Sequence, residues 1–436
     1  MTEHEYPRFS DAEFARRHRA MREKMAQAEV DVLVVYGRGR GGSQVQYLTN
    51  WNVTTEAYLL FPRQGEMAMW VHFYNHVPLA RIASLIPDTG WMGVDPAATV
   101  AEALRRRGLD RGAIGLAGPL PFGPYERLRG LLPDARLVPF NHAFNQLFLV
   151  KSEEELEWLR RGAELGDRAM AALEREARPG LTEHDLAAIV QGAYLGQGGR
   201  NVIHFMSTTP MRAPDVCVPA QYQSHRTIQR GDILITEISV EYWGYGGQSL
   251  RPYAIGEEPT PEYRRMYEVA EAAFHAVAAA MRTGATPADV LTASDLIEAA
   301  GYTIYDDLVH GIGNGYLPPV MRTRGTTVEE APADFRYPEN STWVIQPNVI
   351  TPDERMGLQV GDMVRVTANG AERMHRYPLG FIVSWVGGRP FAALSLETDG
   401  QRIFGLRLVV NPDKLGGLER SRPGPAQPPQ TMNPSG

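Results

Sequence analysis

Apolar and polar positions alternate with two different periods along the first third of the chain. Short apolar runs rich in β-branched residues predict buried strands at residues 30–36 (VDVLVVY), 57–62 and 67–73. Stretches of helix-forming residues predict helices at residues 10–27 and 99–107. Because strands and helices alternate here, we expect residues 1–148 to form an α/β domain.

The second part of the chain shows the same two patterns in longer segments. Ser152 can cap a predicted helix over residues 149–174, whose first turn is acidic and whose later turns are basic. Further helices are predicted at residues 181–194, 260–282 and 286–300, and strands at 233–242, 342–350 and 363–367. We therefore expect a second domain over residues 149–411. Residues 412–436 are rich in Pro, Gly and Ser, and we expect them to be disordered.

The composition excludes several classes of protein. A chain of 436 residues is too long for one ordinary core, which agrees with two domains. With 44 basic against 51 acidic residues and no long basic run, nucleic acid is not an expected partner. Cys217 is the single cysteine, so an internal disulfide framework is excluded and a reducing compartment is indicated. No stretch approaches the roughly 20 apolar residues of a membrane span, and we expect a cytoplasmic protein without a membrane partner.

Glu237 is a candidate acid or base because of its place in a predicted strand. In the run ILITEISVEYW, alternation puts Glu237, Ser239 and Glu241 on one face and apolar residues on the other. A carboxyl group buried among apolar neighbours has a raised pKa, which suits proton transfer at neutral pH. The alternative is a solvated strand face.

His310 and Arg322 are candidates from a glycine-rich segment and the residues that follow it. His310 follows two aspartates and precedes Gly311 and Gly313, which allow close approach of the backbone to a ligand. Histidine also titrates near neutral pH, although a structural histidine is the alternative. Arg322 can hold a carboxylate or phosphate group, although solvated arginines are more common.

Four sequence blocks carry a resemblance to a known family. They are GDILITEISVEYWGYGGQSLRPYAIG at residues 231–256, HGIG at 310–313, IQPN at 345–348 and LQVGDMVRVTANG at 358–370. In this order they resemble the C-terminal domain of the creatinase/prolidase/methionine-aminopeptidase family, the pita-bread hydrolases. The resemblance covers about residues 10–405. It implies a smaller N-terminal α/β domain and a C-terminal domain with a curved, mostly antiparallel sheet covered by helices.

The resemblance also shows what this chain lacks. In the peptidase members the four blocks carry Asp, Asp, His, Glu and Glu, which hold two divalent metal ions. The matching positions here are Glu237, Gln248, His310, Gln346 and Gly361. Two close dications need several anionic ligands, and glutamine and glycine supply none. We therefore expect no bound metal and no other cofactor, and an Xaa-Pro peptidase is not expected.

The family match gives the remaining candidates their roles. Gln248 and Gln346 are expected to bind a polar organic group, unless they are a remnant of lost activity. His204 lies close to where family members have a strand that lines the substrate site. Relatives are commonly dimers, so a homodimer is expected.

The most direct functional hypothesis is a metal-independent hydrolase. It cleaves a C–N bond of amide or amidine type in a small polar substrate, with His310 and Glu237 as the acid/base pair. Creatinase is a metal-free precedent within the family, although its catalytic histidine falls at Ala220 here. A lyase or isomerase, a catalytically silent binding protein and a one-metal enzyme are the alternatives.

Overall fold

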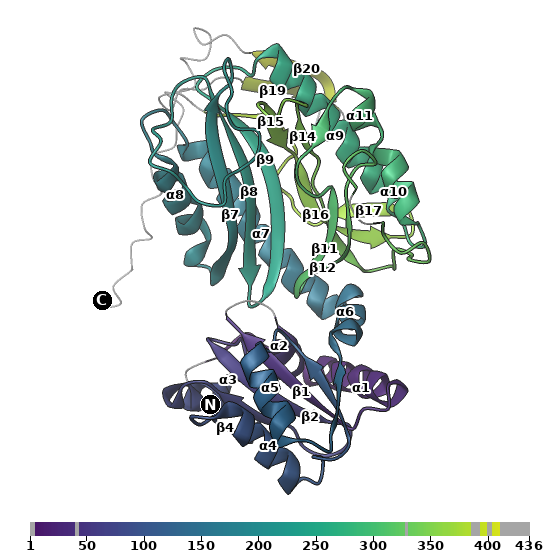
Figure 1. Cartoon of the computed structure of the whole chain (residues 1–436). Helices are drawn as coiled ribbons and strands as arrows, with labels where there is room; N and C mark the ends of the chain where they lie inside the picture. Colours follow the sequence, from purple (N-terminus) through teal and green to yellow (C-terminus); the bar gives the residue numbers. More distant parts are fainter. Residues whose placement is uncertain (1–4, 40–42, 328–329, 385–392, 399–402, 410–436) are drawn as a thin grey trace, which may run out of the picture.

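The chain folds into two domains. The computed structural model describes residues 5–39, 43–327, 330–384, 393–398 and 403–409. Figure 1 shows the N-terminal domain in purple to blue below the C-terminal domain in teal to yellow-green. The expected architecture, a smaller α/β domain followed by a pita-bread domain, is confirmed. Residues 412–436, for which we expect disorder, lie outside the described residues.

A six-stranded mixed sheet forms the centre of the N-terminal domain. Its order is β4-β3-β2-β1-β5-β6. The strands are β1 (Val32–Arg38), β2 (Glu56–Pro62), β3 (Ala68–Val71), β4 (Thr89–Trp91), β5 (Ala113–Ala117) and β6 (Arg136–Pro139). The helices are α1 (Asp11–Gln27), α2 (Gln44–Thr49), η1 (Tyr74–His76), α3 (Val77–Ala83), α4 (Pro96–Arg106), α5 (Phe122–Leu131) and α6 (Asn141–Leu149). Strand β1 is apolar from Val32 to Tyr36 because alternate residues enter two different cores, Leu33 one and Val34 the other.

A curved and mostly antiparallel sheet of nine strands forms the centre of the C-terminal domain. Seven strands lie in the order β12-β11-β13-β16-β9-β8-β7, with β17 beside β16 and β18 beside β9. Their bounds are β7 (Gly199–Pro210), β8 (Asp232–Tyr242), β9 (Tyr245–Ile255), β11 (Val309–Gly313), β12 (Gly315–Met321), β13 (Thr342–Ile345), β16 (Gly361–Thr367), β17 (Gly370–Arg373) and β18 (Ile382–Ser384). Two smaller sheets contain β10 (Thr303–Ile304), β14 (Asn348–Ile350) and β15 (Gly357–Gln359), and β19 (Ala393–Thr398) and β20 (Ile403–Val409).

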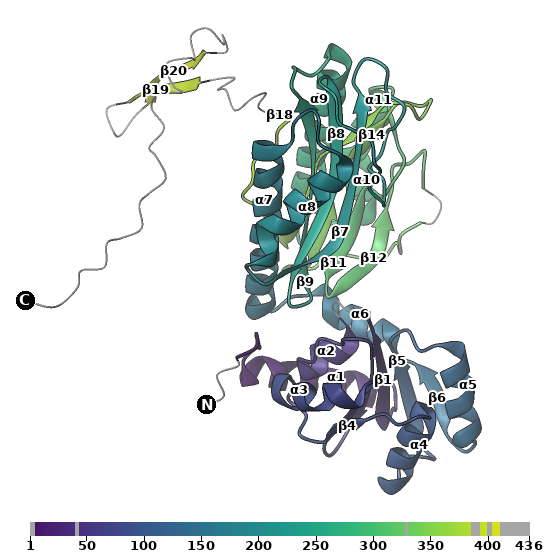
Figure 2. The same ribbon diagram turned by 90° about the vertical axis from the view of Figure 1, so that its left-hand side faces the viewer.

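Helices cover the large sheet in two groups (Figure 2). Helices α7 (Glu153–Glu176) and α8 (Glu183–Leu195) pack on β7, β8 and β9. Helices α9 (Pro261–Ala280), α10 (Pro287–Ser294) and α11 (Leu296–Ala299) lie over the later strands. The expected cap at Ser152 is present as a full capping box with Glu155. In the described part of the chain, no helix is long and apolar enough to cross a lipid bilayer.

Two predicted elements are interrupted. The helix expected over residues 286–300 breaks at Asp295 into α10 and α11. The strand expected over residues 342–350 breaks at Gln346 and Pro347, because proline has no N–H for the ladder. Strand β14 then pairs with β10 and β15 in another sheet. The break leaves Gln346 directly after the end of β13, beside the site described below.

The two domains share a buried contact close to that site. Arg17 of α1 is fully buried and donates to Glu13 at 2.7 Å and to the Tyr245 hydroxyl at 3.1 Å. It also lies 3.3 Å from Glu155 of α7. Leu317 of β12 packs into an apolar cluster of the N-terminal domain. The β11–β12 hairpin is therefore held between the two domains.

Candidate active site

Four elements of the large sheet bring the candidate polar side chains together. Glu237 lies in β8, Gln248 in β9 and His310 in β11, and Gln346 follows β13. All four are at least 95% buried. The Gln248 amide nitrogen donates to Oε1 of Glu237 at 3.0 Å and to Oε1 of Gln346 at 2.8 Å. Glu237, Gln248 and Gln346 thus form one hydrogen-bonded group centred on Gln248, and His310 joins it through Gln346.

Glu237 is shifted toward its protonated form. Burial, with smaller contributions from the negative charges of Asp306 and Asp307, raises its pKa to about 8. At neutral pH this side chain is mainly a carboxylic acid, which can donate a proton.

His310 is shifted toward its neutral form. Burial lowers its pKa, while the hydrogen bond to the Gly311 carbonyl, the charge of Asp307 and the hydrogen bond with Gln346 act in the opposite direction. Nδ1 lies 3.1 Å from the Gly311 carbonyl oxygen, and because a carbonyl only accepts, Nδ1 carries the hydrogen. Nε2 of the neutral ring is then the basic atom.

Tyr316 holds the other side of the His310 ring. The two rings stack with centroids 4.3 Å apart, and the Tyr316 hydroxyl donates to Asp307. Neither Tyr316 nor Asp307 was among our candidates. The aspartate pair before His310 was the only signal in the sequence, because the partner of Asp307 comes from the neighbouring strand β12.

A cavity of about 310 Å³ adjoins this group. Its lining includes His310, Tyr316, Gln248, Ser239 and Glu241, and Ser239 of β8 is paired with Gln248 of β9. Glu237 is not in the lining but contacts the cavity through Gln248. The cavity is large enough for a small organic molecule.

The side chains present do not fit a pair of metal ions. Gln248 directs N–H donors toward Glu237 and Gln346, where a metal ligand must present lone pairs. At Gly361 an added Cβ would lie 2.4 Å from the Ile345 carbonyl oxygen, so this backbone has no room for a carboxylate. Among the described residues, no three His, Cys, Asp or Glu side chains are grouped so as to hold a metal ion.

Two of the expected site residues lie outside the cavity. His204 is paired with Ile238 in the β7–β8 register, on the opposite face from Glu237, and its Nε2 lies 2.9 Å from the Tyr194 hydroxyl. Burial lowers the pKa of His204 to about 4. Arg322 donates to the carbonyl of Tyr305 at 2.9 Å and lines a different pocket. Neither His204 nor Arg322 lines the cavity at His310.

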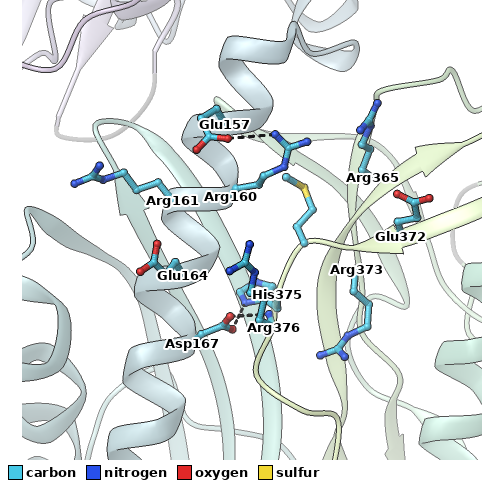
Figure 3. Close-up of a pocket in the computed structure, with 11 residues that line it drawn as sticks. Glu157, Arg160, Arg161, Glu164, Asp167, Arg365, Glu372, Arg373, His375 and Arg376 are labelled. Atoms are coloured by element: carbon cyan, nitrogen blue, oxygen red, sulfur yellow. Dashed lines mark hydrogen bonds and ion pairs between the residues drawn. The ribbon is translucent and has the colours of Figure 1, made fainter. Parts of the chain in front are cut away.

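A second polar hollow, of about 370 Å³, lies between α7 and the β16–β17 hairpin (Figure 3). Several of its charges are paired, including Arg160 with Glu157 at 3.3 Å and His375 with Asp167 at 2.8 Å. Figure 3 shows its arginine side chains pointing in different directions rather than toward one point. It shares no lining residue with the cavity at His310 and is not part of the candidate active site.

Replacement of Glu237 by glutamine tests the carboxylic acid form. Because the folded-state pKa is about 8 against an ordinary 4.5, wild-type protein loses stability as the pH rises through this range. The loss reaches roughly 5 kcal/mol, at 1.36 kcal/mol per pKa unit. At about pH 8.5, Glu237→Gln is expected to unfold at a higher urea concentration than wild type. At about pH 4.5, the two proteins are expected to unfold at similar urea concentrations. Urea unfolding of Glu237→Gln and of the exposed control Glu372→Gln measures this, and equal pH dependence of both variants would contradict it.

Comparison with known proteins finds a family match for each domain. Residues 17–149 match the Creatinase/Prolidase N-terminal domain, and residues 157–368 match Metallopeptidase family M24. The probable dipeptidase PepE of Mycobacterium tuberculosis is 30% identical over 261 residues. That match spans 58% of this chain and 64% of the relative, which is less than two thirds of its length.

Solved structures match across both domains. The dipeptidase PepE from Mycobacterium ulcerans has a TM-score of 0.72 at 26% identity, over 86% of this chain and 99% of that one. The X-Pro aminopeptidase from Thermotoga maritima has a TM-score of 0.73 at 17% identity, over 84% of this chain and 99% of that one. With a family match on each domain and this shared fold, the chain belongs to the creatinase/prolidase family of pita-bread hydrolases.

Proposed function

We propose that the chain is a metal-independent hydrolase that cleaves a C–N bond of amide or amidine type in a small polar substrate. One observation carries this proposal. A buried carboxylic acid, Glu237, and a neutral histidine, His310, are linked to one cavity through Gln248 and Gln346. Environments that shift an acid and a base in opposite directions are typical of acid/base catalysis.

The geometry supports the following sequence of proton transfers. Nε2 of His310 takes a proton from water, and the resulting hydroxide attacks the carbon of the C–N bond. Glu237 gives its proton to the leaving nitrogen once the substrate replaces Gln248 as its partner. The proton on His310 then returns to Glu237, so both groups recover their starting forms. The freed amides of Gln248 and Gln346 hold polar atoms of the substrate.

The relatives support hydrolysis but bear names that refer to peptide substrates. They are named as dipeptidases and an X-Pro aminopeptidase. We propose that this chain shares the cleavage of a C–N bond with these relatives but not the peptide substrate. The reason is that Gln248, Gln346 and Gly361, which the family resemblance matches to metal-ligand positions, carry no carboxylate.

Metal removal is expected to leave activity unchanged. Protein prepared without a metal-binding tag is dialysed against a chelator, its metal content is measured by elemental analysis, and release of amine or ammonia is followed over a panel of small amides, lactams and amidines. We expect turnover to be equal before and after dialysis, because the proposed proton transfers need no metal. Turnover that falls with chelation and returns with one added divalent ion would contradict the proposal and favour a one-metal enzyme.

The same panel separates the other functions. An unsaturated or rearranged product would indicate a lyase or an isomerase. A ligand that binds without forming product would indicate a catalytically silent binding protein.

A further inference from the structure

The cavity beside His310 has no cationic side chain in its described lining. Its ionisable groups are Glu241, His310 and Tyr316, and no lysine or arginine is among the described residues that line it. The shifted pKa of His310 favours the uncharged ring. Asp306 and Asp307 add negative charge close to Glu237. An anionic ligand therefore finds no counter-charge in this lining, and a cationic ligand finds one carboxyl group, that of Glu241.

Glu241 lines the cavity and forms an ion pair with Arg200, which does not line it. It is paired with Arg200 across the β7–β8 register, and the two side chains form an ion pair. Glu241 lines the cavity, whereas Arg200 lines a separate pocket of about 200 Å³ beside Trp51 and Trp243. The negative end of the pair thus faces the cavity. Arg200 contacts Oε1 of Glu241, and a carboxylate has further acceptor sites on its other oxygen.

Ser239 supplies a second polar group beside Glu241. It lies two residues earlier on β8, is 2% exposed and also lines the cavity. Its hydroxyl has no hydrogen-bond partner among the described residues. A buried polar group without a partner is costly, and a ligand that donates a hydrogen bond removes that cost.

We propose that Ser239 and Glu241 form the specificity end of the cavity and recognise a compact cation that carries N–H donors, an ammonium or amidinium group. This inference rests on the proposed function and narrows its substrate class. Small cations are accepted, and a free carboxylate, such as that of a dipeptide, is rejected at this end. A site built to accept hydrogen bonds discriminates strongly against analogues that cannot donate them.

Three ligands of nearly equal shape test the inference. Acetamidinium, acetamide and acetate differ in charge and in donors but little in size. Binding to the full chain is measured by isothermal titration at neutral pH and constant ionic strength. We expect acetamidinium to bind at least about tenfold more tightly than acetamide, and acetate not to bind. Acetate binding as tightly as acetamidinium would overturn the inference.

Two variants locate the contact. Glu241→Gln is expected to weaken acetamidinium binding by about tenfold or more, because it removes the charge but keeps the shape. Glu241→Gln also leaves Arg200 without its ion-pair partner, so a second variant is needed. Ser239→Ala removes only one unpaired hydroxyl, and it is expected to weaken acetamidinium binding by about threefold to tenfold. Unchanged affinity in folded forms of both variants would overturn the inference.

A third variant separates this inference from the proposed function. His310→Ala is expected to retain acetamidinium binding, because the proposed contact is made by Ser239 and Glu241 of β8, whereas His310 belongs to β11. Wild-type protein that binds acetamidinium but turns over no substrate would reject the proposed function and leave the cation site standing. Turnover of anionic substrates alone would reject the cation site and leave the hydrolase standing.

Discussion

Replacing His310 by alanine is expected to lower kcat by about 10²–10⁴-fold on any substrate that the wild type turns over. Nε2 of this ring is the basic atom of the site that lines the cavity, and Gln346 and Tyr316 hold the ring in place. Substrate binding at Ser239 and Glu241 is left intact, so KM is expected to change less than kcat. Steady-state kinetics and circular dichroism on the purified variant measure both parts of this expectation.

His204 provides the matched control for this variant. It is also a buried histidine of the same domain, but it bonds Tyr194 on the other face of the β7–β8 ladder. His204→Ala is expected to lower the unfolding midpoint while kcat stays within about threefold of wild type. A normal rate in His310→Ala, or an equal loss of kcat in His204→Ala, would show that the acid/base assignment is wrong.

The order of apolar runs was sufficient to predict the α/β character of the N-terminal domain, whereas the pita-bread fold was predicted from the family resemblance of the four sequence blocks. Strands β1, β2 and β3 appear where short apolar runs stand, and α7 begins at the serine that was expected to cap it. The breaks at Asp295 and Pro347 were missed because the flanking residues on both sides fit one continuous element. Pro347 alone carried a signal, since proline cannot donate to a strand ladder.

The site was only partly predictable because the sequence of one strand does not determine the register in which it pairs with its neighbours. Alternation along β8 was enough to put Glu237, Ser239 and Glu241 on one face. It could not show which face of β7 meets them, and the observed register turns His204 away. The stacking of Tyr316 on His310 likewise depends on how the β11–β12 hairpin pairs. Local pattern thus predicted the polar strand face, and long-range pairing decided which side chains share the cavity.

At Gly361, which the family resemblance matches to a metal-ligand position, the backbone leaves no room for a side chain. An added Cβ would lie 2.4 Å from the Ile345 carbonyl oxygen and 2.9 Å from Cα of Gln346. Both neighbours are backbone atoms of strongly paired segments, so relief requires movement of β16 against β13.

Substitution of Gly361 by glutamate is therefore expected to lower the free energy of unfolding by at least about 3 kcal/mol and to bring no metal into the site. Urea unfolding of the full chain measures the first part, and elemental analysis after incubation with zinc or manganese measures the second. Gly123→Ala on helix α5 is the matched control, because a Cβ added at Gly123 has no atom within 4 Å. This variant is expected to be as stable as wild type or slightly more stable. The expectation would be contradicted if Gly361→Glu were as stable as wild type and bound one metal ion per chain. The backbone would then still accommodate a metal ligand, and the side chains alone would explain why the wild type lacks a metal site.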